Sequence, residues 1–96
     1  MSLLDSALAA VLSHRDSART LGVELIGVFG SVARGEAGPE SDVDIAYDIV
    51  GAATLFGLGE LAMDLQDHLG RKVDLVDISQ VRPRVRAAVE RDLVTP

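Results

Sequence analysis

Residues 29–44 read FGSVARGEAGPESDVD. This run begins at the end of residues 23–29, an apolar, partly β-branched segment bounded by glycines, which predicts a buried strand. The chain then turns at Gly30 and Ser31 into an expected helix start and crosses a loop. It resumes over residues 43–49 with alternating polarity, which predicts a second strand. We therefore expect a strand, a tight turn into a helix, and a second strand in the first half of the chain.

The segments before and after this run predict three further helices and one further strand. Ser2 and Asp5 resemble a capping box, and an apolar stripe follows them, so we expect a helix from about residue 2 to residue 19, ended by Gly22. A second long helix carries an apolar face and closes at Gly70. That face consists of Leu55, Leu58, Ala62, Leu65 and Leu69. Residues 72–77 predict a third strand, and a last helix begins at Pro83.

This order of elements predicts the fold class. Helices alternate with short strands, which indicates an α/β (α+β) domain with helices packed on a small mixed sheet. No repeat or linker interrupts the 96 residues, so we expect one domain over residues 1–96.

Composition excludes several classes of function. The chain has no cysteine, which excludes disulfides, thiolate metal sites and cysteine nucleophiles. It shows no signal peptide and no apolar stretch of membrane-spanning length, so we expect a soluble, cytoplasmic protein. Its formal net charge of −6 makes binding to long nucleic acid a poor candidate function, because such binding depends on cationic side chains that neutralise phosphates.

The aspartates of the second and third strands point to a metal site. Asp42 and Asp44 are two residues apart on a strand, so their carboxylates project from the same face. Two like charges about 4 Å apart cost roughly 4 kcal/mol at an effective dielectric near 20, and a divalent cation removes that conflict. Asp74 completes the cluster if the third strand pairs beside the second. Oxygen ligands of this kind suit Mg²⁺, together with the phosphates of a substrate.

The turn at Gly30 and Ser31 predicts a phosphate site. A glycine allows the backbone to approach a ligand closely, and the following N–H groups suit an anion. Ser31 adds a hydroxyl donor, and Arg34 lies one helical turn further on. Carboxylates beside a phosphate-binding turn indicate two-metal phosphoryl or nucleotidyl transfer. We expect Asp42 and Asp44 to bridge two ions, and Asp74 to bind one of them and to act as general base or to orient the nucleophile.

The residues quoted above resemble the signature of the minimal nucleotidyltransferases, a branch of the polymerase-beta superfamily. Gly30-Ser31 is followed by ten residues and then Asp42-Val43-Asp44, and residues 72–76 resemble the strand of the third aspartate. The resemblance covers nearly the whole chain and implies a polymerase-beta-like nucleotidyltransferase fold. Val32 departs from the pattern, because family members often carry a polar or larger residue there.

The family implies a specific reaction and a partner. Its small members are commonly encoded beside a HEPN-domain ribonuclease toxin and act as antitoxins, transferring AMP from ATP to a tyrosine hydroxyl of that toxin. Two alternatives stay open: an antitoxin that neutralises its partner by binding alone, and a small-molecule nucleotidyltransferase whose acceptor site another subunit supplies.

The basic cluster near the C-terminus has two interpretations as well, a solvated helix face or a contact for phosphate or for an acidic partner. It consists of Arg82, Arg84, Arg86 and Arg91.

Overall fold

A computed structural model describes all of residues 1–96. Along the chain the elements are α1 (Leu3–Ser13), α2 (Arg15–Thr20), β1 (Val23–Phe29), α3 (Gly30–Ala33), β2 (Val43–Ile49), α4 (Leu55–Leu69), β3 (Val73–Asp77) and α5 (Pro83–Asp92). The predicted order of elements and the α+β class are confirmed. None of the helices combines the length and the apolar character that crossing a membrane requires.

The three strands form one mixed sheet in the order β1-β2-β3. Strands β1 and β2 are antiparallel, and Phe29 is the partner of Asp44. Strands β2 and β3 are parallel, joined through α4, and Asp44 is the partner of Asp74. The predicted pairing of the third strand beside the second is therefore confirmed.

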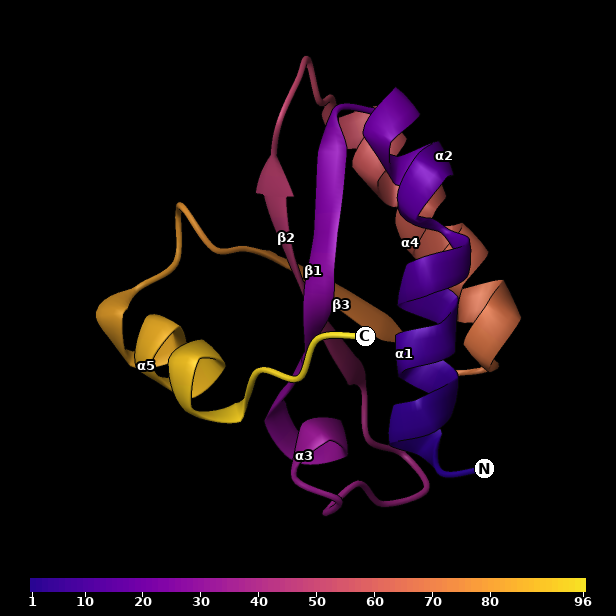
Figure 1. Cartoon of the computed structure of the whole chain (residues 1–96), viewed down its shortest axis with the longest axis vertical. Coiled ribbons are helices and arrows are strands. Elements are labelled where there is room, and N and C mark those ends of the chain that lie inside the picture. The colour runs from indigo at the N-terminus through magenta and orange to yellow at the C-terminus, as the bar shows by residue number, and fades with distance from the viewer.

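Helices cover both faces of the sheet, so the fold has three layers (Figure 1). Helices α1, α2 and α4 lie on one side and enclose the main core, which takes Leu25, Val28 and Ile45 from the strands and Leu61 and Leu65 from α4. Helix α5 lies on the other side, where Val89 packs against Phe29 and Ala46 in a smaller cluster. The alternation of β2 explains this division, because successive side chains of a strand point to opposite faces.

The first helix differs from the prediction. One helix was expected from about residue 2 to residue 19, but the structure has two, separated at His14. At the break, the Ser13 hydroxyl donates to the Ala9 carbonyl oxygen at 2.8 Å, and Nδ1 of His14 lies 2.9 Å from the Ala10 oxygen. Side chains that compete for helical carbonyls favour such a break. The Ser2–Asp5 capping box is confirmed, as is Gly70 as the left-handed C-cap of α4, with φ 66°.

The chain after α5 returns to the sheet. Val94 forms an isolated antiparallel bridge with Val28, with backbone hydrogen bonds of 2.9 and 2.8 Å. Gly27 permits this approach, because a Cβ at that position would collide with the carbonyl oxygen of Val94. The edge of β1 that faces away from β2 is thus partly covered by residues from the other end of the chain.

Candidate active site

The tight turn after β1 brings Gly30 directly against Asp44. Gly30 has φ +77°, a left-handed conformation that favours glycine, and a Cβ built on it would collide with Oδ2 of Asp44. The strand register explains the contact, because Asp44 is the partner of Phe29, the residue before Gly30. Glycine is therefore required here both by the backbone and by the neighbouring carboxylate.

Asp44 is the most perturbed carboxylate of the site. Burial raises the pKa of Asp44 above its ordinary value, and the negative charges of Asp74 and Asp42 raise it further, against a smaller opposing effect of Arg34. The strand register pairs Asp44 with Asp74, and Asp42 lies two residues before Asp44 in the chain. The structure thus brings together the three aspartates that sequence reasoning singled out.

The three carboxylates do not form a closed metal cage. No group of three or more His, Cys, Asp or Glu side chains in the structure is arranged tightly enough to hold a metal ion. Magnesium ions, however, are commonly held by one or two carboxylates together with substrate phosphates and water. The adjacent Asp44 and Asp74, with Asp42 nearby, fit this kind of open oxygen site by their chemistry.

Asp42 lies at the end of the loop before β2, and two basic residues hold this region. The Lys72 ammonium lies 3.7 Å from Oδ2 of Asp42, in an ion pair largely exposed to solvent. Arg71 donates from Nη1 to the carbonyl oxygens of Gly38 and Ser41, at 2.8 and 3.2 Å. The loop that precedes Asp42 is therefore fastened to the residues that lead into β3.

Helix α3 begins at Gly30, and no side chain caps its first N–H groups. Uncapped N–H groups at a helix start are donors for an anion. Ser31 lies in the first turn and is partly exposed, whereas Val32 points into the main core. The departure from the family pattern at Val32 is therefore a packing feature.

Arg34 is held by two acidic residues rather than left free in solvent. Its Nη1 donates to Oδ2 of Asp92 at 2.6 Å, and its Nε donates to Glu36 at 3.0 Å. Asp92 also accepts from Arg91 at 3.0 Å and is almost completely buried. Sequence reasoning missed Asp92, because a carboxylate at the end of an amphipathic helix carries no pattern that indicates a distant arginine.

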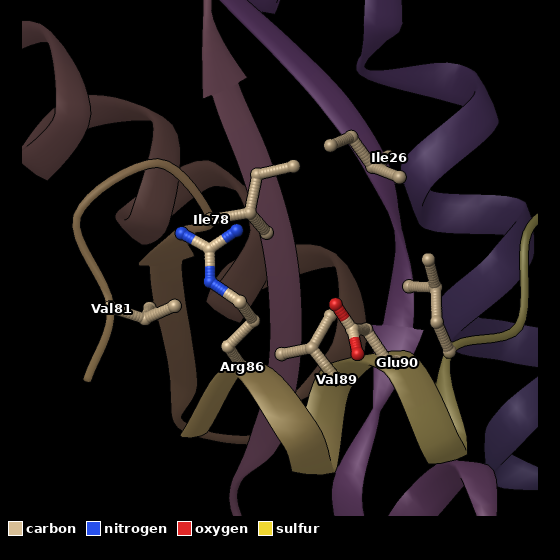
Figure 2. Close-up of a pocket in the computed structure, with 7 residues that line it drawn as sticks. Ile26, Ile78, Val81, Arg86, Val89 and Glu90 are labelled. Carbon is tan, nitrogen blue, oxygen red and sulfur yellow. The ribbon is translucent and has the colours of Figure 1, made fainter. Parts of the chain in front are cut away.

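An apolar pocket of about 170 Å³ lies on the same face of the sheet as Asp44 and Asp74, between the sheet and α5. Figure 2 shows Ile26 and Ile78 on the sheet side and Val89 on the helix, with Arg86 and Glu90 also on α5. None of its lining residues was singled out as a site residue. Arg86, one of the basic C-terminal cluster, thus borders this pocket.

Comparison with known proteins gives a consistent result. The family model described as "Polymerase beta, Nucleotidyltransferase" matches residues 12–94. A protein adenylyltransferase MntA of Thermococcus cleftensis is 38% identical over 95 residues, which cover 98% of this chain and 96% of that protein.

Two solved structures extend the similarity to the fold. One, described as a candidate minimal nucleotidyltransferase, has a TM-score of 0.79 and 36% identity, covering 100% of this chain and 97% of its own. The other is a toxin–antitoxin complex with AMP-PNP, with a TM-score of 0.72 and 26% identity over 88% of this chain and 67% of that one.

Proposed function

This chain belongs to the polymerase beta nucleotidyltransferase family, and we propose that it is a protein adenylyltransferase acting as an antitoxin. It transfers AMP from ATP to a hydroxyl group, that of a tyrosine, on a HEPN-type ribonuclease toxin. The observation that carries the proposal is the strand register, which sets Asp44 beside Asp74 and against Gly30. The similarity to an MntA adenylyltransferase and to a toxin–antitoxin complex with AMP-PNP supports the reaction and the kind of partner.

The nucleotide binds at the turn between β1 and α3. Gly30 brings the backbone close to the triphosphate, and the uncapped N–H groups of α3 and the Ser31 hydroxyl donate to its oxygens. Arg34 has donors beyond the two that it uses in the ion pairs with Asp92 and Glu36, and these face a phosphate oxygen in the proposed complex.

Asp42, Asp44 and Asp74 are the residues that would hold the divalent cations. Burial and the negative charges of Asp74 and Asp42 raise the pKa of Asp44, and a bound cation would offset these effects, which supports its role as a ligand. Two bound Mg²⁺ ions would supply charge neutralisation at the triphosphate and activation of the attacking hydroxyl.

The chemical step breaks a phosphoanhydride bond of ATP and forms a phosphodiester bond to the acceptor. The acceptor hydroxyl oxygen forms a bond to the α-phosphorus of ATP, and the bond from that phosphorus to the β-phosphate bridging oxygen breaks, so that pyrophosphate leaves. Asp74 accepts the hydroxyl proton or orients the hydroxyl for attack. The partner contributes the acceptor, and this chain contributes the nucleotide and the carboxylates.

Labelled ATP tests the proposal. The protein is incubated with Mg²⁺, the HEPN-type partner, and ATP labelled at either the α- or the γ-phosphate. We expect the partner to acquire label from α-labelled ATP only, and Asp44→Asn to abolish that transfer. Label from γ-labelled ATP alone would mean phosphoryl transfer and would overturn the proposal.

Neutralisation by binding alone is a second candidate. The observation that favours it is that Asp92 and Glu36 already engage Arg34, the proposed phosphate donor. The same experiment separates the two: if Asp44→Asn still neutralises the toxin without transferring AMP, binding is the mechanism.

A further inference from the structure

The outer face of α4 exposes large apolar side chains that the fold does not use. Leu55, Phe56 and Met63 are 87%, 84% and 63% exposed. With Gly59 and Glu60 they line a hollow of about 660 Å³. Contiguous exposed apolar side chains are a feature of interaction sites on soluble proteins. We refer to these five residues as the α4 surface.

Gly59 has no role in the fold that requires glycine. A Cβ built on it meets no atom within 4 Å, and its φ is not positive. Gly57, by contrast, is buried, and a Cβ there would lie 3.2 Å from the hydroxyl oxygen of Thr54, which caps the helix. A glycine in a helix interior costs stability relative to alanine, so Gly59 weakens the helix while leaving this part of its surface without a side chain.

An acidic column runs beside this hollow. Glu60, Asp64 and Asp67 are all exposed, follow one another at helical spacings of four and three, and take part in none of the ion pairs of the structure. Like charges at such spacings destabilise an isolated helix slightly. The column, like Gly59, is therefore unfavourable for the free protein.

We propose that the α4 surface is a docking site for a helix of a partner protein, which inserts an apolar side chain beside Gly59 and surrounds it with Lys or Arg. Small residues on a helix permit close approach of a second helix, and the acidic column complements a basic rim. A second copy of this chain does not fit, because two α4 surfaces would bring their acidic columns together. The partner is the HEPN-type protein that accepts AMP in the proposed function, so the identity of the partner rests on that proposal.

The docking site and the carboxylates lie on opposite sides of the sheet. Helices α1 and α4 lie on one side of the sheet and α5 lies on the other (Figure 1). Asp44 and Asp74 alternate with strand residues of the main core, so they share the face of Ala46 and Val76, which pack with Val89 of α5. Substitutions on the α4 surface therefore leave the nucleotide site unchanged, and binding of the partner can be measured apart from the transfer of AMP.

Affinity for the HEPN-type partner, measured by calorimetry with purified proteins, tests the docking site. Gly59→Ala should raise the melting temperature of the free protein and yet weaken partner binding at least about tenfold, and Phe56→Ser should weaken it similarly. Leu12→Ser, at another exposed leucine on α1, is the matched control and should bind as the wild type does. Neutralising Glu60, Asp64 and Asp67 together should reduce the salt dependence of the affinity.

The outcomes separate this inference from the proposed function. Wild-type affinity of both Gly59→Ala and Phe56→Ser would overturn the docking site, even if AMP transfer proceeds. Loss of affinity in these variants supports it, even if no AMP is transferred. Sedimentation of the chain alone is the second measurement: a dimer that Phe56→Ser dissociates would make a second copy the occupant and would overturn the proposal.

Discussion

Arg34 and Asp92, 58 residues apart in the chain, share a 2.6 Å hydrogen bond between Nη1 and Oδ2. The pair joins the turn after β1 to the end of α5, and Arg91 donates to the same carboxylate. It therefore couples the conformation of the proposed phosphate site to the docking of the last helix.

The ion pair predicts a specific response to acid. Hydrogen bonds from Arg91 and Arg34 hold the pKa of Asp92 below its ordinary value, against the opposing effect of burial. The stabilisation is therefore fully present above the unfolded-state pKa of about 3.9, and it is lost as the pH falls through the lowered folded-state pKa. Asp92→Asn should flatten the acid limb of the stability curve below about pH 4, measured by urea unfolding between pH 2.5 and 7. Glu36→Gln, which removes only the exposed partner of Arg34, is the control and should leave the curve nearly unchanged.

Asp44→Asn should raise stability while removing activity. The folded-state pKa of Asp44 is raised, so its ionised form is disfavoured by folding, and stability falls as the pH rises from the unfolded-state pKa through the folded-state pKa. At pH 7 without divalent cations, the variant should melt at a higher temperature than the wild type. Transfer of AMP should fall at least about 100-fold. If Asp44→Asn melts at a lower temperature than the wild type at pH 7 and at the same temperature at pH 3, the ionised Asp44 carboxylate does not destabilise the folded protein.

Magnesium should stabilise the folded protein through the carboxylate of Asp44. A ligand that binds only the folded state stabilises it by about 2.7 kcal/mol at a concentration 100 times its Kd. We expect Mg²⁺ with a non-hydrolysable ATP analogue to raise the melting temperature of the wild type, and EDTA to reverse the rise. Asp44→Asn should show a much smaller rise, and Asp48→Asn, further along the same strand, should respond as the wild type does.

Gly30 and Gly35 distinguish the cost of a left-handed backbone from the cost of a steric contact, because their backbone conformations are similar. Gly30 and Gly35 have φ +77° and +73°, but a Cβ at Gly35 meets nothing within 4 Å, whereas one at Gly30 meets the carboxylate of Asp44. Gly35→Ala should cost only the left-handed conformation, about 1 to 2 kcal/mol. Gly30→Ala should cost more in the free energy of unfolding and should also abolish transfer, because Asp44 must move. Equal costs and equal activities in the two variants would show that the contact with Asp44 is unimportant.

Much of the fold and the core of the site could be predicted from local patterns. The alternating polarity of residues 43–49 predicted a strand, and the structure has β2 over these residues, with Val43 and Ile45 in the main core. The pairing of Asp44 with Asp74 followed from assuming that the third strand lies beside the second. Patterns of this kind succeed because they depend on side chains only a few residues apart.

What the sequence did not predict depends on contacts between distant residues. The role of Asp92 and the bridge from Val94 to Val28 are invisible in any local window, since the residues next to them show only an ordinary helix end. The break at His14 is local, but it results from side-chain hydrogen bonds that compete with the helix, which an apolar stripe does not reveal.

The bridge between Val28 and Val94 also bears on how the molecule is made. On the ribosome, β1 and β2 emerge early and can pair at once, because their contacts are close in sequence. The covering of the β1 edge and the anchoring of Arg34 must wait until residues 92–94 have been translated. A nascent chain halted before that point exposes an open strand edge, which is the kind of surface that pairs with other chains. The outer edge of β1 thus stays open to other chains until Val94 is in place.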